Sequence, residues 1–408
     1  MKKKNKRREL SDIMLSIRVK SIKPSPTLSM DAKAKEMKAS GIDVISFGVG
    51  EPDFDTPDNI KEAAIKAIKD GFTKYTPVPG TPELRKAITE KLSTDNSVDY
   101  KPEEIIVSCG AKHSLYVIAQ ALYDKGDEVI IPSPYWVSYP DQVLLNDAKP
   151  VIVQTREEDS FMIKPEELEK HVTGNTKALI LNYPSNPTGL TYDRATLEAI
   201  AELAVKHDFF IVSDEIYEKL VYDGTGHICF ASLGEEVRQK TLVVNGLSKS
   251  HSMTGWRIGY TAGPVDIIKA MTKIQGQSTS NPTSISQAAA IEALRGPQDF
   301  IKTMLDAFDK RRKYLVDELN KLDGVSCLKP VGAFYVFPNV NGLLGRSYNG
   351  RKIDNSSDLA SYLLEEAHIA LVPGSAFGAE GFMRMSYANS MENIQEGVKR
   401  IKKAIGAS

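Results

Sequence analysis

The feature that most constrains the fold is an alternation of short apolar runs with helical segments that begins at residue 105. The runs are rich in β-branched side chains, and most end at a turn that contains glycine, proline or a polar residue. They cover residues 105–108, 128–131, 151–153, 178–181, 209–212, 241–245 and 258–262. Buried strands that alternate with helices are typical of a mostly parallel sheet covered by helices. The sequence therefore predicts an α/β fold.

Glycine, aromatic or polar residues follow five of these runs. Parallel strands place their carboxyl ends at one edge of a sheet, and open α/β folds build ligand sites there. The residues just past the runs are Gly110, Trp136, Asn186, Asp214 and Lys249. A glycine turn between a strand and a helix, as at Gly110, also offers backbone N–H groups and the helix dipole to an anion. We therefore expect these five residues to converge on one site.

The segment around Lys249 joins the last two runs. Lys249 follows the run at 241–245, and Arg257 opens the run at 258–262. Nearby glycines allow a ligand to approach the backbone closely. A lysine and an arginine taken at random are mostly exposed surface residues, so neither identifies a site by itself.

The stretch from Ser248-Lys249 to Arg257-Ile258-Gly259 resembles the pyridoxal-phosphate attachment segment of the class I and II aminotransferases. In that family the lysine forms the Schiff base and the arginine binds the cofactor phosphate. The resemblance covers nearly the whole chain from about residue 14. It is closest to the bacterial aspartate aminotransferases of the subgroup typified by thermophile enzymes, through the runs PYWVSYP at 134–140 and TGWRIGY at 254–260.

The resemblance implies fold type I of the pyridoxal-phosphate transferases. In this fold a large domain holds a mostly parallel, seven-stranded sheet flanked by helices, and both chain ends build a smaller α/β domain. We expect a disordered basic tail at 1–13, an N-terminal segment at 14–58 that packs with the small domain, the large domain at 59–300 and the small domain at 301–408. Helical periodicity predicts helices at 32–38, 59–70 and 82–92, and one long helix at 287–322, bent near Gly296-Pro297.

The resemblance also assigns roles at the cofactor ring. Lys249, Asp214 and Tyr217 would be the catalytic residues, and Asp214 would keep the pyridine nitrogen protonated. Asn186 and Tyr217 would donate to the phenolic oxygen, and Trp136 would stack on the ring. Without the resemblance, Asp214 would more often be a helix N-cap, Asn186 part of a turn, and Trp136 a core residue.

The cofactor phosphate would be bound by Arg257 and by the turn that contains Gly110, Ala111 and Lys112. Many relatives carry a serine three residues before the lysine, where this chain has Gly246, and Ser248 is the expected replacement. Tyr75 lies in a Pro/Gly loop and is either a packing residue or a presented hydroxyl. The resemblance implies that it reaches the cofactor phosphate of the neighbouring subunit, which makes a homodimer with active sites at the interface.

The substrate α-carboxylate would bind Arg384, whose guanidinium can form two parallel hydrogen bonds. Gly50 opens the substrate-proximal GEPDF loop, and Trp136 and Asn186 would also contact the substrate. The distal carboxylate of a dicarboxylate would meet Lys112, while Lys23 and Thr27 close over it. The resemblance therefore implies ping-pong transfer of an amino group between L-aspartate and 2-oxoglutarate, with oxaloacetate and L-glutamate as products and a pyridoxamine form between the half-reactions.

Other reactions on the same scaffold stay open. A lysine is a flexible point charge and selects less strictly than an arginine fork. Prephenate or broad-specificity, alanine, aromatic or kynurenine aminotransferases and carbon–sulfur lyases are the alternatives. A remote alternative is a regulator that binds the cofactor without turnover. Such regulators carry a DNA-binding domain ahead of the scaffold, and only about 30 residues precede the first clear element here.

Composition excludes several other classes. The formal net charge of −1 gives no case for nucleic acid or an anionic membrane as a partner. No apolar run is long enough to span a membrane, and the basic run at 2–8 is expected to be a frayed terminus. The three cysteines lie far apart and the six histidines form no HExxH motif. We therefore expect no disulfide, no metal and a reducing cytoplasm.

Overall fold

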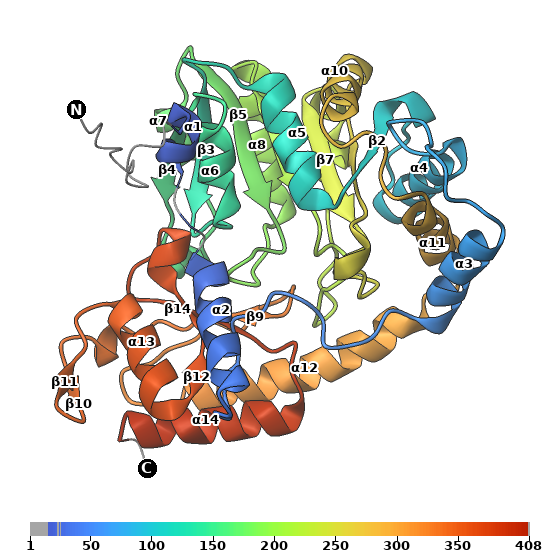
Figure 1. Ribbon diagram of the computed structural model, residues 1–408. Helices are drawn as coiled ribbons and strands as arrows, with labels where there is room; N and C mark the ends of the chain where they lie inside the picture. Colours follow the sequence, from blue (N-terminus) through green and yellow to red (C-terminus); the bar gives the residue numbers. More distant parts are fainter. Residues whose placement is uncertain (1–14, 23, 25, 407–408) are drawn as a thin grey trace, which may run out of the picture.

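The computed structural model describes residues 15–22, 24 and 26–406. At its centre is a seven-stranded sheet with the strand order β2-β8-β7-β6-β5-β3-β4 (Figure 1). Neighbouring strands are parallel except at β8, which is antiparallel to both β2 and β7. The strands are β2 (Ile105–Ser108), β3 (Glu128–Ser133), β4 (Lys149–Gln154), β5 (Thr176–Asn182), β6 (Phe210–Asp214), β7 (Thr241–Gly246) and β8 (Gly259–Ala262). The predicted mostly parallel sheet is confirmed, and each strand coincides with one of the apolar runs.

Helices cover both faces of this sheet, which is why the central residues of its strands are mostly apolar on both faces. Successive side chains of a strand point to opposite faces, so Leu242 and Val244 join one core and Val243 the other. The first face packs on α5 (Ala111–Leu122), α6 (Ser138–Leu144) and α10 (Val265–Gly276). The second packs on α3 (Asp58–Lys69), α4 (Pro82–Asn96), α7 (Pro165–His171), α8 (Arg194–Lys206), α9 (Glu235–Arg238) and α11 (Ser284–Arg295).

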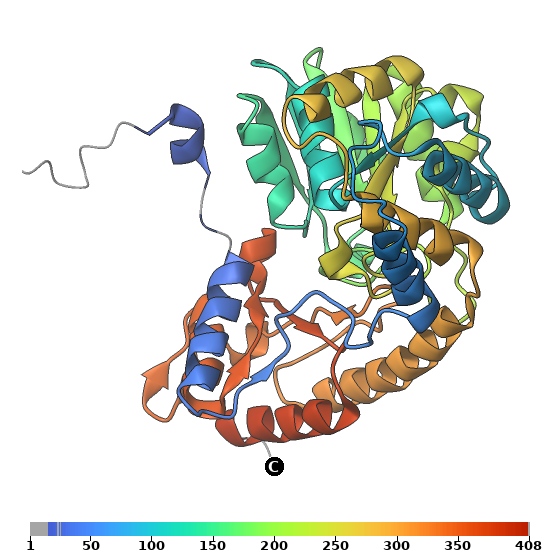
Figure 2. The ribbon, with the colours of Figure 1, turned by 45° about the vertical axis from the view of Figure 1, so that its right-hand side comes forward.

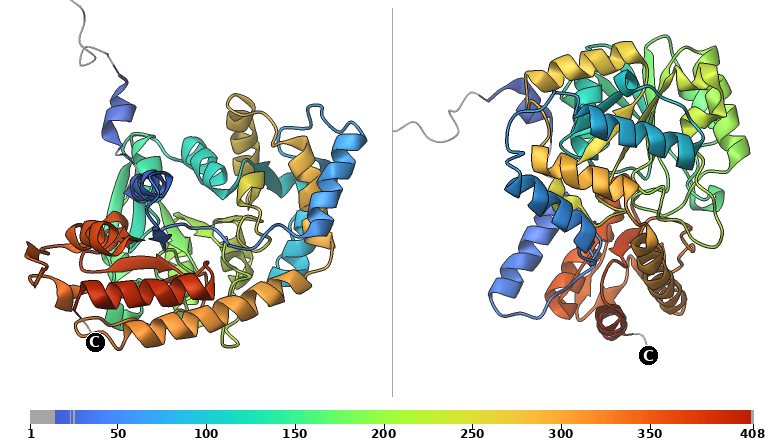
Figure 3. Two further views of the ribbon diagram at one scale, coloured as in Figure 1. Left: turned by 60° about the horizontal axis from the view of Figure 1, so that its bottom comes forward. Right: turned by 90° about the vertical axis from the view of Figure 1, so that its right-hand side faces the viewer.

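The two ends of the chain form a second, smaller unit. Its three-stranded antiparallel sheet has the order β13-β14-β9, and β1 of the N-terminal segment pairs in parallel with β12. Figure 2 shows α2 lying along the C-terminal elements, and Figure 3 shows α12 and α14 side by side. The elements are α2 (Pro26–Ala39), β1 (Ile45–Ser46), α12 (Asp299–Leu319), β9 (Tyr335–Val336), β10 (Ser347–Tyr348), β11 (Arg351–Lys352), α13 (Ser356–Ala367), β12 (Ile369–Ala370), β13 (Val372–Pro373), β14 (Met383–Ser386) and α14 (Met391–Ala404). Helix α1 (Ile17–Ser21) instead contacts α6, beside the central sheet. A small unit built from both chain ends is therefore confirmed, whereas the exact domain boundaries stay a prediction.

Three predicted helices differ from the structure. The single bent helix expected at 287–322 is wrong, because the chain breaks into α11 and α12 at Gly296. Pro297 lacks an N–H group and disfavours the helical conformation of the residue before it, and Gly296 is extended with ψ −175°. Helix α2 begins at Pro26, where proline suits a first turn, and α4 continues to Asn96.

Among the described residues, no helix combines the length and the apolar character needed to cross a membrane.

The N-terminal segment is fixed to the small unit at Phe47. Its N–H group donates to the carbonyl of Ala370 at 2.7 Å, and its carbonyl accepts from the N–H group of Ser386 at 2.8 Å. Its ring is fully buried and lies against Gly397 of α14. A Cβ atom at position 397 would lie 2.5 Å from that ring, so only glycine fits there.

The contact between Gly397 and Phe47 predicts the effect of a single methyl group. Gly397→Ala should lower the free energy of unfolding by about 1–3 kcal/mol, because overpacking outweighs the better helix propensity of alanine. Gly276→Ala is the matched control, since the nearest atoms there are methyl groups of Val78 at 3.9 Å. Urea unfolding of both variants measures the difference. Equal stability of the two variants would contradict this packing.

Candidate active site

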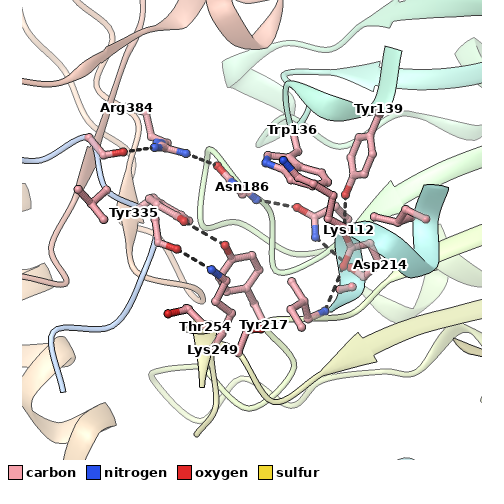
Figure 4. Close-up of a pocket in the computed structure, with 18 of the residues that line it drawn as sticks. Lys112, Trp136, Tyr139, Asn186, Asp214, Tyr217, Lys249, Thr254, Tyr335 and Arg384 are labelled. Carbon is pink, nitrogen blue, oxygen red and sulfur yellow. Dashed lines mark hydrogen bonds between the residues drawn. The ribbon is translucent and has the colours of Figure 1, made fainter. Parts of the chain in front are cut away.

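A cavity of about 310 Å³ lies at the carboxyl edge of the central sheet, facing the small unit (Figure 4). Four of the five residues expected to converge line it, namely Trp136, Asn186, Asp214 and Lys249. The other predicted site residues in its wall are Gly50, Ala111, Lys112, Tyr217, Ser248, Arg257 and Arg384. The shared strand edge therefore brings most of the predicted site together.

Among the described residues, two predicted site residues, Gly110 and Tyr75, do not line the cavity. Gly110 lies one residue outside the wall and packs against the guanidinium of Arg257. Tyr75 is 91% exposed on the loop between α3 and α4, so its predicted contact with a neighbouring subunit stays a prediction. Lys23 and the side chain of Thr27 lie outside the described part of the chain.

The wall also contains residues to which the sequence analysis gave no role. Tyr139, Asn182, Thr254 and Tyr335 are among them. Asn182 is the last residue of β5, so the strand-edge argument could have found it. Tyr139 lies within the run 134–140 that carried the family resemblance, and Thr254 lies within the run 254–260. Tyr335 had no such signal, because it stands inside an apolar strand.

Lys249 extends from the turn after β7 into the cavity. Its Nζ donates to the carbonyl oxygen of Gly50 at 2.5 Å. Burial lowers the pKa of Lys249 to about 8, although Glu51 opposes the shift. A buried amine whose pKa is near neutrality can act both as a nucleophile and as a proton carrier.

Asp214 ends β6 and points into the same cavity. The hydroxyl of Tyr139 donates to its carboxylate at 2.6 Å, and the N–H group of Ile216 donates at 3.3 Å. Burial raises the pKa of Asp214 to about 6, while the hydrogen bond from Tyr139 acts in the opposite direction. A buried carboxylate of this kind is stabilised by a cationic group placed beside it.

The other end of the cavity is suited to an anion. Gly110, with φ 89°, ends the strand-to-helix turn, and α5 starts at Ala111, so first-turn N–H groups and the helix dipole face the site. Arg257 donates to the carbonyl oxygens of Thr254 at 2.7 Å and Cys109 at 3.2 Å. A Cβ atom at position 110 would lie 2.4 Å from its guanidinium. Arg257 itself has φ 57°, a strained conformation for a non-glycine residue, as occurs at ligand sites.

Arg384 is buried and has unused hydrogen-bonding capacity. It donates to Oδ1 of Asn186 at 2.9 Å and to the carbonyl oxygen of Gly48 at 2.6 Å. Its Nε has no hydrogen-bond partner among the described residues, and burial lowers its pKa. The ring of Tyr335 lies 4.6 Å from the guanidinium carbon. A buried cation with a free donor and no carboxylate partner is suited to the carboxylate of a ligand.

Tyr217, a predicted catalytic residue, contacts Tyr335, whose ring lies against Arg384. Their hydroxyl oxygens are 3.0 Å apart, and both rings are buried. Burial raises the pKa of both hydroxyls, so both remain protonated donors at neutral pH. Tyr335 therefore orients a predicted catalytic residue while its ring supports Arg384.

The residues present fit pyridoxal phosphate. The turn at Gly110 and Arg257 could hold its phosphate, and the carboxylate of Asp214 could pair with a protonated ring nitrogen. Lys249 could supply the amine, and Trp136 could supply an aromatic face. The cavity volume is within the range that small-molecule ligands occupy.

The lowered pKa of Lys249 predicts a stability cost in the cofactor-free protein. Below pH 8, Lys249 is protonated in both the folded and the unfolded chain, and the folded state bears the full cost of the buried charge. Between pH 8 and 10.5, Lys249 is protonated only in the unfolded chain. The folded state therefore becomes relatively more stable as the pH rises. Lys249→Met should therefore raise the free energy of unfolding at pH 7 by about 2 kcal/mol, with the gain vanishing toward pH 10.5. Urea unfolding at both pH values measures it, with the exposed Lys170→Met as control. Destabilisation at pH 7 would contradict this account.

Comparison with known proteins gives a consistent result. The family model described as aminotransferase class I and II matches residues 42–401. An aspartate aminotransferase of Bacillus sp. (strain YM-2) is 51% identical over 392 residues, which cover 96% of this chain and 99% of that protein. A probable aspartate/prephenate aminotransferase of Rickettsia felis is 51% identical over 396 residues, 97% of each chain.

Solved structures agree with this assignment. The aspartate aminotransferase from Rhizobium meliloti has a TM-score of 0.94 at 45% identity and covers 97% of this chain and 99% of its own. The aspartate aminotransferase from Thermus thermophilus, solved with maleate, has a TM-score of 0.91 at 43% identity and covers 96% and 100%. The chain therefore belongs to the class I and II aminotransferases, which are pyridoxal phosphate enzymes.

Proposed function

We propose that this aminotransferase moves the α-amino group between L-aspartate and 2-oxoglutarate, with oxaloacetate and L-glutamate as products. The observation that carries the proposal is that two cationic side chains, Arg384 and Lys112, line one cavity together with Lys249. Figure 4 shows Arg384 at one end of the row of side chains and Lys112 toward the other. A dicarboxylate needs a cation for each carboxylate. The names of the relatives, and the maleate in one solved structure, support the same choice.

In this proposal Arg384 binds the α-carboxylate. Its free Nε would donate to one carboxylate oxygen, and one of its terminal nitrogens to the other. Asn186 and the carbonyl of Gly48 hold the guanidinium plane, so the orientation exists before substrate arrives. The rings of Tyr335 and Phe377 flank it at 4.6 and 5.1 Å and limit access of water.

Lys112 would bind the distal carboxylate. Its ammonium lies 4.8 Å from the ring centre of Trp136. Burial and the neighbouring Arg257 lower the pKa of Lys112, so a carboxylate placed beside it would stabilise its charged form. Its flexible side chain can follow carboxylates at different distances, so acceptance of prephenate is a second candidate, as in relatives named aspartate/prephenate aminotransferase.

Lys249 would be both the attachment point of the cofactor and the proton carrier. Pyridoxal phosphate supplies the electron sink that makes the substrate Cα proton labile. Released from the cofactor, Lys249 can take that proton at Nζ and return it, because its pKa of about 8 is close to neutral pH. Its position depends on the carbonyl of Gly50, which accepts its hydrogen bond.

The remaining site residues would hold and tune the cofactor. Asp214, oriented by Tyr139, would keep the ring nitrogen protonated, and Asn186 with Tyr217 would donate to the phenolic oxygen. The phosphate would be held by Arg257, by Ser248 and by the amides after Gly110, with Trp136 stacked on the ring. Tyr75 would complete the phosphate site of a neighbouring subunit, and its 91% exposure in the single chain supports a homodimer as part of the proposal. Three free cysteines fit the proposed reducing cytoplasm.

The N-terminal segment would close the site. Carbonyl oxygens of Gly48 and Gly50 accept from the two principal cations, Arg384 and Lys249, so a movement of either cation would be coupled to this segment. A second attachment lies at Thr254, whose hydroxyl donates to Glu51 at 2.9 Å. Substrate that replaces these carbonyl contacts would couple binding to closure of the segment and the small unit.

Lys112→Ser tests the choice of a dicarboxylate. We expect kcat/KM for L-aspartate with 2-oxoglutarate to fall about 10- to 100-fold, because the variant lacks one charged hydrogen bond to the distal carboxylate. A slow side reaction with L-alanine, which has no distal carboxylate, should change by less than about twofold. Lys170→Ser, on the exposed face of α7, is the matched control. Unchanged activity with aspartate, or an equal loss with alanine, would contradict the proposal.

A further inference from the structure

The turn that carries Asp214 and Tyr217 also carries two carboxylates that face away from the active site. Glu215 is fully buried and Glu218 is 7% exposed, yet neither lines the active-site cavity. Glu218 instead borders a separate cavity of about 180 Å³ behind the turn. Residues 214–218 therefore present Asp214, Ile216 and Tyr217 to the active-site cavity and two carboxylates to the protein interior.

Glu218 forms a buried ion pair with Lys91 of α4. The two side chains are 6% and 8% exposed, and the ammonium of Lys91 contacts the carboxylate directly. Lys91 also donates to Oδ1 of Asn96 at 2.7 Å, and Nδ2 of Asn96 donates to the second carboxylate oxygen of Glu218 at 2.8 Å. Burial opposes both charges, but Lys91 lowers the pKa of Glu218 to about 2, so the pair stays charged.

Glu215 fixes the other side of the turn. It accepts from the hydroxyl of Ser213 at 2.8 Å and from the N–H group of Phe230 at 3.0 Å. Its second oxygen lies 2.8 Å from Nε2 of His227. The turn is thus attached to α4 through Glu218 and to the segment 227–230 through Glu215.

A metal site is not the explanation for this cluster. Ligand atoms of Glu215, Glu218 and His227 lie within 4.8 Å of one another. However, the ammonium of Lys91 already supplies the cation, and each carboxylate oxygen already has a partner. The carboxylate oxygens of the cluster are therefore satisfied by groups of the protein itself.

Stability alone does not explain a buried ion pair either. The cost of removing two charges from water usually equals or exceeds their attraction, and apolar residues of similar volume are often as stable. What such a pair supplies is one preferred arrangement, because any displacement leaves a buried charge without its partner. Here that arrangement fixes a turn whose other side chains lie in the active site.

We propose that the buried pair Lys91–Glu218, together with Asn96, is a positioning device that holds the turn 214–218 and thereby places Asp214 and Tyr217 in the active site. The proposal rests on the function proposed above for these two residues. It assigns Lys91 and Glu218 as positioning residues, since neither lines the active-site cavity.

The test replaces the pair by apolar residues of similar volume. In Lys91→Met/Glu218→Met we expect the thermal midpoint to stay within a few degrees of the natural protein. Amide hydrogen exchange of segment 214–220, measured on the cofactor-free protein, should be about tenfold faster. The kcat for aspartate should fall about 10- to 100-fold with KM changed much less, because the reacting groups lose their alignment.

Lys219→Met is the matched control. Lys219 pairs at 2.7 Å with Asp95 of α4, the helix that also carries Lys91, but both side chains are about one-third exposed. Loss of the Lys219 charge should therefore change each measurement by less than about twofold. If the double variant does not fold, the uncharged polar pair Lys91→Gln/Glu218→Gln takes its place, because it leaves neither partner as a lone buried charge. Normal exchange in segment 214–220, or faster exchange with normal kcat, would overturn the proposal. Absence of aspartate activity in the natural protein would instead overturn the proposed function, and the exchange measurement would still decide whether the pair holds the turn.

Discussion

The active site depends on the burial of two cations that form no ion pair with a carboxylate in the described part of the chain. Lys249 and Arg384 project into one cavity, and burial lowers the pKa of both. Within the described residues, their hydrogen bonds go to backbone carbonyls and one amide oxygen, chiefly the carbonyls of Gly48 and Gly50 in the N-terminal segment. These neutral contacts compensate incompletely for lost hydration, so the site favours anionic ligands. The pairing of β1 with β12 and the packing of Phe47 on Gly397 keep this segment in place.

The sheet provides the second condition, a common edge for residues that are distant in sequence. Because β3, β5, β6 and β7 run in parallel, the turns after them meet at one end of the fold. A turn at this edge can direct some side chains into the cavity and others into the interior. The turn 214–218 shows the separation most clearly, with Asp214 and Tyr217 on the reaction side and Glu215 and Glu218 in a buried polar network.

Much of the fold and the site followed from the sequence, because buried parallel strands and strand-edge residues have strong local patterns. The seven apolar runs predicted the strands, and the polar residues after them predicted the cavity. Tyr335 was missed because a tyrosine within an apolar strand has the pattern of a core residue. Lys91 and Glu218 were missed because charged residues on a helix and in a turn are normally exposed. The break at Gly296-Pro297 was interpreted as a bend, since the helical pattern continues on both sides of it.

The most direct test of the account is the visible absorption spectrum of the purified protein before and after L-aspartate is added without a keto acid. The account predicts a yellow protein, because the cofactor is bound to Lys249, and loss of the yellow band with aspartate as the first half-reaction runs. A yellow band that persists with aspartate but is lost with another amino acid would contradict the dicarboxylate assignment. A protein that stays colourless with added pyridoxal phosphate would contradict the account of the site as a whole.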